Sequence, residues 1–523
     1  MKKTSSHRSL HIHSPLSKKI LIAFSLLIPL SLAVLSLLGG HVSLWYDPAR
    51  DLLSAWDNLS DPTLIGPTSG IPGIFYGPYW IWLLSVGMLF SKDPGVIAFI
   101  TASLPYLIIF PLLWFRFSKI WGLAVAICGW LLFMISTGET YATQLWNPYP
   151  APLLTLAVIY LLSVIDFQKL VRKHILLALL IGFLTGVIIN FHISFGIGLL
   201  CGLLFFLLIT TGLNLRKTKQ KKQLLMQHLL WYLLIGGGLV MAYLPALLFE
   251  VRHGFNQTQV LLNALVNYGD VVSIKGLEKT QILQQFSVSL SKVLQIPAPV
   301  VSFLLVTLPF TYIVLLVKRK ITINQTDIRI LTVLLSSIAG ILFIYLTARN
   351  PVWEYHFIGV EVLLLMILLF FMSKIGLYRY ALIIWTIGIV SISIYTQFTT
   401  FNPSANTGFV EQKKIVTTIK ADAKDDQYGA IAYSPSIYMY DYSYLFRWLA
   451  DKDVPYDPSA NEEKETIYLI VPRQQDAKTE DFINFRTPKD QYETEKSWEF
   501  QYNIILKRVK NKESMLSFEH NQR

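Results

Sequence analysis

The stretch that decides the fold is residues 20–61, ILIAFSLLIPLSLAVLSLLGGHVSLWYDPARDLLSAWDNLSD. Residues 20–38 carry no charge, and a helix needs roughly 20 mostly apolar residues to cross the hydrocarbon of a membrane. The residues that follow carry four aspartates, Asp47, Asp51, Asp57 and Asp61, within a short distance. This segment therefore predicts a membrane-spanning helix that leads into an acidic segment at the membrane surface.

Further apolar runs follow along the chain, which is 53% hydrophobic and only 15% charged. Because runs of this length and density exclude a water-soluble core, the sequence predicts a polytopic α-helical membrane protein with about 11–12 transmembrane helices. We expect the first run to be a retained helix rather than a removed signal peptide, since no small-residue cleavage site follows it. The twelve runs are 20–38, 73–91, 94–115, 120–136, 151–165, 175–190, 193–213, 229–249, 297–317, 330–347, 357–373 and 380–396.

The net charge of +12 is unevenly distributed along the chain. Residues from Asn402 onward contain 20 acidic and 17 basic side chains, against 13 and 28 before it, so the tail is −3 and the rest is +15. The excess basic residues lie in short loops, which indicates membrane topology rather than nucleic-acid binding. Cys128 and Cys201 both lie inside apolar runs, so the sequence predicts neither a disulfide framework nor a zinc site.

Short loops rich in Lys and Arg face the cytoplasm. These loops fall on one side of the membrane only if the runs 73–91 and 94–115 together make one net crossing, and the Pro and Gly residues of GIPGIFYGP (70–78) are compatible with that. The basic clusters are Lys2–Lys19, 116–119, 168–173, 216–222, 318–320 and Lys374–Arg379.

The loop charges thus predict eleven crossings with the N-terminal residues 1–19 in the cytoplasm. The membrane domain would cover residues 20–397, with external loops at 41–72 and 251–296. The tail, residues 398–523, would form a small extracytoplasmic α/β domain, because it has strand-like runs such as TIYLIV (466–471) and a helical run, SYLFRWLA (443–450).

The four aspartates are not expected to be equivalent. Asp51, Asp57 and Asp61 suit the polar face of an interfacial helix, where acids favour the first turn and an i, i+4 pair faces solvent. Asp47 differs because it follows the interfacial Trp45 just after the first span ends. A carboxylate at that position is partly desolvated and can act as a base or a metal ligand.

The order of these parts resembles that of the GT-C glycosyltransferases. A first span leads to an acid, an interfacial helix, the segment GIPGIFYGPYWIWLL (70–84) and a further acid in the next external loop. The resemblance is to protein O-mannosyltransferases and lipid A aminoarabinose transferases (glycosyltransferase family 39-like). It implies a sugar donor linked to polyprenyl phosphate and a first-loop acid at Asp47. It places the second acid at Glu139 in TGETYATQLWNPYP (137–150), where the family's commoner Pro-Asp pattern is replaced by Trp146-Asn147-Pro148.

The expected chemistry needs both a base and cations. Transfer from a lipid phosphate inverts the anomeric carbon, so a carboxylate must take the proton of the acceptor. The departing phosphate favours cations nearby. The candidates for binding the donor phosphate are Arg252 and His253 in FEVRHGF (249–255) and Arg349 and His356 in ARNPVWEYHF (348–357), although an interfacial Arg also binds lipid headgroups.

Three further residues are candidates for a metal or an accessory role. His192 lies in an outer turn, Glu250 lies two residues before Arg252, and Glu361 lies inside a membrane helix. Each also suits a purely structural role. A divalent cation, Mg²⁺ or Mn²⁺, would suit aspartates beside a phosphate, and the sequence does not decide whether one is needed.

The sequence therefore predicts a multi-pass cell-membrane glycosyltransferase that moves a hexose or pentose from a polyprenyl-phosphate donor to an extracytoplasmic protein, lipid or wall polymer. Its expected partners are the donor, the acceptor and membrane lipids, with no nucleic acid. The alternative is a transporter or flippase for a lipid-linked or anionic substrate. Transporters favour internal repeats and acids at mid-depth in the membrane. This chain has no detectable repeat, and its acids fall near one interface.

The predicted topology can be tested with introduced cysteines. Ser54→Cys and Ser459→Cys should both react with a membrane-impermeant thiol reagent in intact cells, because both positions are expected outside the cytoplasm. Labelling that requires permeabilised cells would contradict this arrangement.

Overall fold

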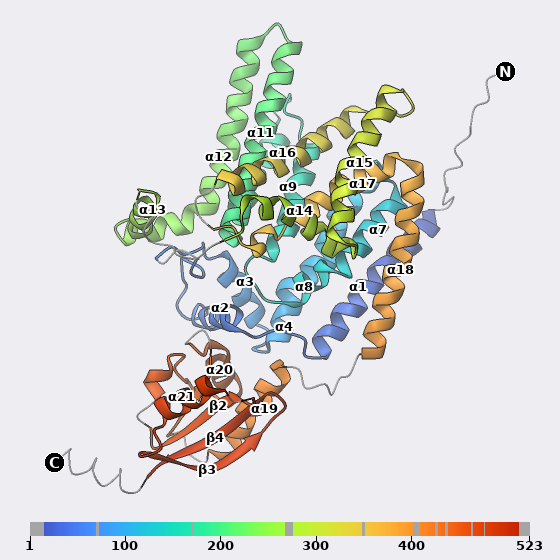
Figure 1. Cartoon of the computed structure of the whole chain (residues 1–523). Coiled ribbons are helices and arrows are strands. Elements are labelled where there is room, and N and C mark those ends of the chain that lie inside the picture. Colours follow the sequence, from blue (N-terminus) through green and yellow to red (C-terminus); the bar gives the residue numbers. More distant parts are fainter. Residues whose placement is uncertain are drawn as a thin grey trace.

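The computed structural model describes residues 15–69, 73–168, 171–266, 276–347, 351–400, 408–423, 427–434, 438–461, 464–474 and 476–511. These residues form a helical membrane region followed by a small domain with a four-stranded sheet (Figure 1). The predicted class, a polytopic α-helical membrane protein with a small C-terminal α/β domain, is confirmed.

Within the described residues, eight helices are long and apolar enough to cross a membrane. One of them, Pro94–Trp121, is assembled from several short pieces. The other seven are α1 (Pro15–Leu38), α10 (Arg172–Phe191), α11 (Ile193–Lys217), α12 (Lys221–Arg252), α15 (Ala298–Val317), α16 (Gln325–Thr347) and α18 (Gly376–Thr400).

The composite helix owes its irregular turns to proline. Pro105 and Pro111 lack the N–H that would continue an α-helical ladder, and π-helical turns accommodate such interruptions. Its pieces are α4 (Pro94–Ala98), η1 (Phe99–Ser103), η2 (Pro105–Ile109), α5 (Phe110–Trp114), η3 (Phe115–Phe117) and α6 (Ser118–Trp121).

The remaining apolar runs form shorter or broken helices. α7 (Leu123–Met134) and α8 (Thr137–Thr143) together have the length of a ninth span but are bent by 59° at their junction. α3 (Tyr79–Met88), α9 (Pro150–Val164) and α17 (Val360–Lys374) have 10, 15 and 15 residues. All twelve predicted runs are therefore helical, but fewer than twelve are full-length spans.

The length of α3 indicates which of the runs 73–91 and 94–115 crosses the membrane. Ten residues at 1.5 Å each give a helix of about 15 Å, half the thickness of the hydrocarbon core. The 28-residue helix Pro94–Trp121 is long enough. We therefore assign the net crossing to the second run, while α3 packs beside α2 (Tyr46–Asp57) at one end of the helical region.

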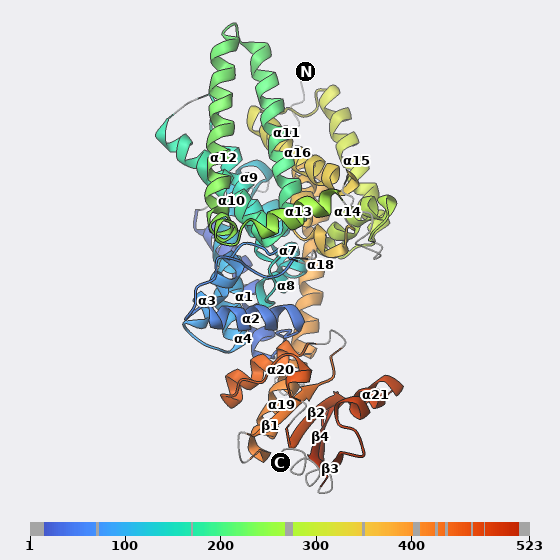
Figure 2. The same cartoon turned by 90° about the vertical axis from the view of Figure 1, so that its left-hand side faces the viewer.

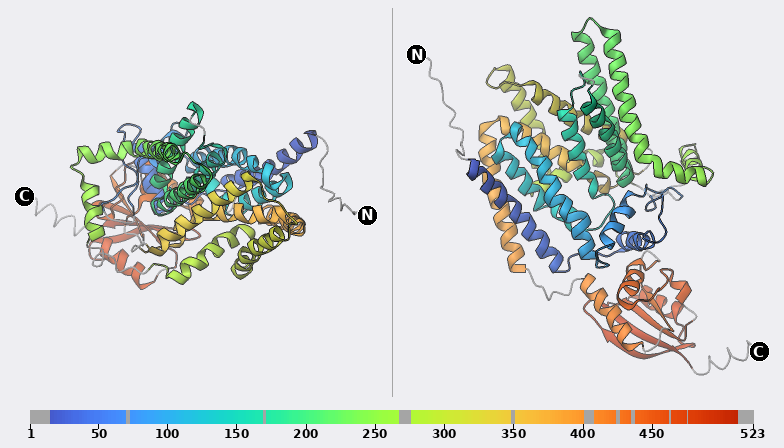
Figure 3. Two further views of the ribbon diagram at one scale, coloured as in Figure 1. Left: turned by 90° about the horizontal axis from the view of Figure 1, so that it is seen from above. Right: turned by 180° about the vertical axis from the view of Figure 1, so that it is seen from behind.

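The predicted cytoplasmic loops lie at the same end of the helical region. The start of α1, the hairpin between α11 and α12, the turn between α15 and α16, and the connection between α17 and α18 all lie at the end away from the tail (Figures 1 and 3). The sheet domain lies at the opposite end, next to α2. This arrangement agrees with the loop charges.

Glycines allow close packing of the spans. A Cβ added to Gly182 of α10 would lie 1.9 Å from the carbonyl oxygen of Ile235 in α12, and one on Gly238 would lie 2.0 Å from that of Leu179. Such contacts between backbones require small residues, as is common where membrane helices associate. α17 occupies the centre of the region, with every residue from Val360 to Met372 buried.

The tail domain has the sheet order β1-β2-β4-β3. β1 (Tyr428–Ala432) and β2 (Thr466–Pro472) are parallel, and β4 (Asn503–Lys510) is antiparallel to both β2 and β3 (Tyr492–Glu499). The predicted strands and the helical run are confirmed. The helical elements are α19 (Gly408–Asp422), α20 (Tyr440–Leu445), η5 (Phe446–Ala450), η6 (Pro458–Asn461) and α21 (Ala477–Arg486).

The tail domain docks through α20 and η5 onto α2 (Figure 2). Tyr444 is fully buried there, and its hydroxyl donates to the carbonyl oxygen of Lys92 at 2.6 Å. Arg447 pairs with Asp57 at 2.6 Å and lies 4.8 Å from the ring of Trp56. Asp57 therefore binds the tail domain, in addition to being exposed as expected.

Truncating the buried tyrosine of this interface tests the docking. Tyr444→Ala should lower the free energy of unfolding by about 3–5 kcal/mol, as for other buried aromatic residues. The measurement is thermal and chemical unfolding of the purified full-length protein. Phe485→Ala is the control, because that ring is 72% exposed. Equal stability of the two variants would contradict the interface.

Candidate functional site

The acidic segment forms a linked group of charges at the start of α2. Arg50 donates through Nη1 to Asp47 Oδ1 at 3.0 Å and through Nη2 to Asp51 Oδ1 at 2.8 Å. Trp80 of α3 donates through its indole N–H to Asp51 Oδ2 at 2.9 Å. The guanidinium of Arg50 therefore pairs with two carboxylates, and Trp80 of α3 binds one of them, Asp51.

The two carboxylates differ in exposure. Asp51 is fully buried, whereas the side chain of Asp47 is 27% exposed. The prediction that Asp51 lies on a solvent-facing helix surface is wrong. Burial raises the pKa of Asp51 to about 6, although Arg50 and Trp80 act in the opposite direction, so this carboxyl is ionised at neutral pH.

Asp47 interacts electrostatically with two tyrosines from distant parts of the chain. Burial, with a smaller contribution from Asp47, raises the pKa of Tyr355. The pKa of Tyr76 is raised by burial and, to a smaller extent, by Tyr355 and Asp47. The three side chains are therefore within electrostatic range of one another. This half-buried carboxylate is the expected setting for a base.

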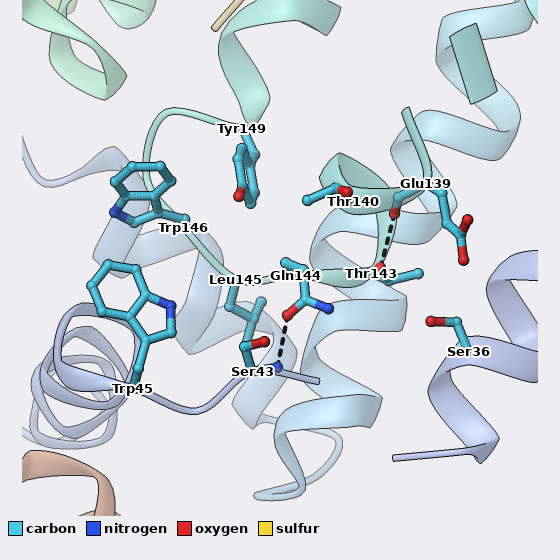
Figure 4. A pocket seen from close by; sticks show the side chains of 10 residues that line it. All are labelled: Ser36, Ser43, Trp45, Glu139, Thr140, Thr143, Gln144, Leu145, Trp146 and Tyr149. Atoms are coloured by element: carbon cyan, nitrogen blue, oxygen red, sulfur yellow. Dashed lines mark hydrogen bonds between the residues drawn. The ribbon is translucent and has the colours of Figure 1, made fainter. Parts of the chain in front are cut away.

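A cavity of 410 Å³ is lined by Trp45, two residues before Asp47, although neither Asp47 nor Arg50 is among its lining residues (Figure 4). The rings of Trp45 and Trp146, 5.7 Å apart, stand at one end of it, while Glu139 and Ser36 stand at the other. Its remaining lining residues are mostly polar: Ser43, Thr140, Thr143, Gln144, Leu145 and Tyr149. Aromatic faces next to hydroxyl and amide groups suit a ligand such as a sugar, which has both apolar C–H faces and hydroxyls.

Glu139 lines this cavity but does not contact Asp47. Its carboxylate accepts a hydrogen bond of 3.0 Å from the side-chain amide of Gln397 in α18. Trp146 lines the same cavity, and its ring lies 5.7 Å from that of Trp45 and 5.7 Å from that of Tyr355. Glu139 and Asp47 are thus related through the cavity, of which Trp45, two residues before Asp47, is a lining residue.

Three of the four predicted phosphate-binding residues are described, and none of these three lines this cavity. Arg252 is exposed at the end of α12, and His253 stacks on Phe249 at 3.9 Å. His356 is buried, and its Nδ1 accepts a hydrogen bond from the backbone N–H of Trp353 at 3.1 Å. Burial lowers the pKa of His356 to about 3, so it carries no positive charge at neutral pH. Arg349 lies outside the described residues.

The three accessory candidates have structural partners. Glu250 is buried and accepts hydrogen bonds from the backbone N–H and the hydroxyl of Thr258, which fixes the start of α13 (Asn256–Val266). His192 is buried, and its Nε2 lies 3.1 Å from the carbonyl oxygen of Tyr355. Burial lowers the pKa of His192 to about 4.

Glu361 accepts hydrogen bonds from the hydroxyl of Tyr141 at 2.8 Å and from the backbone N–H of Gly359 at 3.0 Å. It therefore stabilises the start of α17. Among the described residues, no group of three or more His, Cys, Asp or Glu side chains lies close enough to hold a metal ion. Asp47 and Asp51 share Arg50 instead, so the residues of the site do not fit a divalent cation.

No protein-family model matches the chain, and no curated protein matches it. Among solved structures, it is similar to the archaeal oligosaccharyltransferase AglB from Archaeoglobus fulgidus in complex with an inhibitory peptide and a dolichol-phosphate, with 12% identity over 87% of this chain and 69% of that one and a TM-score of 0.46. The apo form of the A. fulgidus oligosaccharyltransferase gives 13% identity over 86% and 65% and a TM-score of 0.47. Similarity at this level does not establish a shared activity.

Asp51→Asn tests the buried ion pair. The substitution should lower the free energy of unfolding by about 3–5 kcal/mol, because it leaves the partly buried Arg50 without its inner partner. Asp61→Asn is the matched control, since that carboxylate is exposed and should change stability by less than about 0.5 kcal/mol. Thermal unfolding of both variants measures the difference, and an equally stable Asp51→Asn variant would contradict the role of this pair.

Proposed function

We propose that this protein is an integral-membrane glycosyltransferase that moves a sugar from a polyprenyl-phosphate donor to an acceptor on the side of the tail domain. The observation that carries the proposal is the half-buried Asp47, held by Arg50 after the first span and two residues from Trp45, which lines an aromatic and polar cavity. The resemblance of the order of segments to GT-C glycosyltransferases supports the same reading. The donor, the acceptor and the base are inferred from this arrangement.

Asp47 acts as the general base. Arg50 engages Oδ1 of this carboxylate, so Oδ2 is left to accept the proton of the acceptor hydroxyl. The acceptor oxygen then forms a bond to the anomeric carbon while the bond from that carbon to the phosphate oxygen breaks. The electron pair leaves with the lipid phosphate, and the configuration of the sugar inverts.

Arg50 sets the properties of this base. Arg50 pairs with both carboxylates at once, at 3.0 Å from Asp47 and 2.8 Å from Asp51, so the three side chains together carry a net charge of −1. Because Trp80 and the burial of Asp51 fix the other end of Arg50, the carboxylate of Asp47 is held in one orientation before the acceptor arrives.

Glu139 is the second functional acid in this proposal. Its position at the end of the cavity opposite Trp45, where it accepts a hydrogen bond from Gln397, suits a hydrogen bond to a hydroxyl of the sugar rather than proton transfer. Arg252, exposed at the outer end of α12, is proposed to contact the donor phosphate as it enters or leaves.

Loss of the base should abolish most of the transfer. Asp47→Asn keeps the shape of the side chain but removes the basic oxygen, so sugar transfer should fall by about 10²-fold or more. Asp57→Asn and Asp61→Asn should change transfer by less than about threefold, because both carboxylates are exposed and an exposed ion pair such as Asp57–Arg447 contributes little. The measurement is transfer of radiolabelled sugar from polyprenyl phosphate per amount of folded protein.

The same assay separates the enzyme from a transporter. Movement of the lipid-linked substrate across a vesicle membrane without transfer of its sugar would indicate a flippase and refute the proposal. If the Asp47→Asn variant is active while the Asp57→Asn variant is inactive, the assignment of the base to Asp47 is wrong.

A further inference from the structure

The break between α7 and α8 opens a second cavity, of 560 Å³. The residues at the break form one wall, and the end of α14 (Lys279–Leu294) with the residues after it forms the other. Thr140 lines both this cavity and the 410 Å³ cavity that contains Glu139. The two cavities are therefore neighbours, separated by one turn of α8.

Three of the six polar side chains that line the second cavity are satisfied within the protein. The hydroxyl of Ser136 donates to the carbonyl oxygen of Leu132 at 2.6 Å, and that of Ser291 donates to Ile296 at 2.6 Å. The side-chain amide of Gln295 donates to the carbonyl oxygen of Lys292 at 2.9 Å. These groups keep the shape of the walls and are not available to a ligand.

Thr137 and Lys292 differ from these groups. The hydroxyl of Thr137 has no hydrogen-bond partner among the described residues and is shielded from solvent, so a rotation of its side chain would bring it to a ligand. Lys292 is exposed at the cavity and forms no ion pair with a described residue, although it lies within electrostatic range of the buried Glu361. An ammonium group beside a free hydroxyl suits an oxyanion such as a phosphate.

The surface next to the cavity suits an apolar chain. α15 begins just after the cavity-lining residues Ile296 and Pro297, and its exposed side chains include Phe303, Val306 and Phe310, at 66%, 71% and 67% exposure. α15 is one of the helices that can cross the membrane, so this surface meets lipid. A ligand here would have an anionic head and an apolar chain.

We propose that this second cavity binds the phosphate of a polyprenyl-phosphate lipid, with Lys292 as its ion-pair partner and Thr137 as a hydrogen-bond donor. The chain of the lipid lies along α15, and the group attached to the phosphate passes Thr140 into the cavity of Glu139. The identification of the lipid as the sugar donor rests on the proposed function. The phosphate site itself rests on the residues of the cavity.

Binding of polyprenyl monophosphate to the purified full-length protein in lipid nanodiscs tests this site. Lys292→Gln should weaken binding by about tenfold or more, the usual scale for losing a charged hydrogen bond, and Lys292→Arg should restore most of it. Thr137→Val should weaken it by a smaller factor. Lys279→Gln is the matched control, because Lys279 is also exposed but lies at the other end of α14.

Three outcomes would overturn the site. If Lys292→Gln binds the lipid as well as wild type does, Lys292 is not the ion-pair partner of the phosphate. If only Arg252→Ala binds more weakly, the phosphate lies at the end of α12. Displacement of polyprenyl phosphate by an equal concentration of phosphatidylglycerol would show a general headgroup site rather than a donor site.

The binding measurement requires no sugar transfer, so it separates the two proposals. Lys292-dependent binding in a protein without transferase activity would retain this site and refute the proposed function. Full transfer by Lys292→Gln at low donor concentration would retain the enzyme and refute this site.

Discussion

The candidate site depends on the ion pairs that Arg50 forms with Asp47 and Asp51. A buried carboxylate is costly unless a charge and hydrogen bonds compensate it, and here Arg50 and the indole of Trp80 do so. The inner half of the group is therefore fixed by packing, while the outer half, Asp47, is 27% exposed and in the proposed function uses its second oxygen as the base. Truncating Trp80 would loosen Asp47 indirectly, through Asp51 and Arg50.

α2 carries this group and is held on two sides. Asp51 binds α3 through Trp80, while Trp56 and Asp57 bind the tail domain through Tyr444 and Arg447. Tyr46, next to Asp47, also packs against Tyr440 of the tail with ring centroids 4.9 Å apart. The tail domain therefore completes the surroundings of the site, and movement of α20 would be transmitted to α2.

The lengths of the apolar runs predicted most of the helices. The features that the sequence did not predict depend on pairing between polar groups that lie far apart in the chain. All twelve apolar runs are helical, since apolar runs of this length have few other ways to satisfy their backbone in a membrane. The burial of Asp51 was not predictable from its i, i+4 neighbours, because its partner Trp80 lies 29 positions away. A signal was nonetheless present in the adjacent Arg50. β3 was missed because its exposed face is a run of polar residues, with pairing to β4 in place of apolar alternation.

The difference between hydrophobic length and polar pairing also explains why the predicted phosphate-binding residues do not line the cavity of Glu139. Arg252 and His356 share a position at outer helix ends, and sequence can place them only at an interface. Whether such a residue reaches a ligand depends on the bends between helices, and the sequence does not give the angle of a bend: Ser136 and Gly138 mark the end of the apolar run, but not the 59° between α7 and α8. The residues after the run, which the sequence predicts as an external loop, form α8 instead, and Thr137 and Thr140 on it line two adjacent cavities.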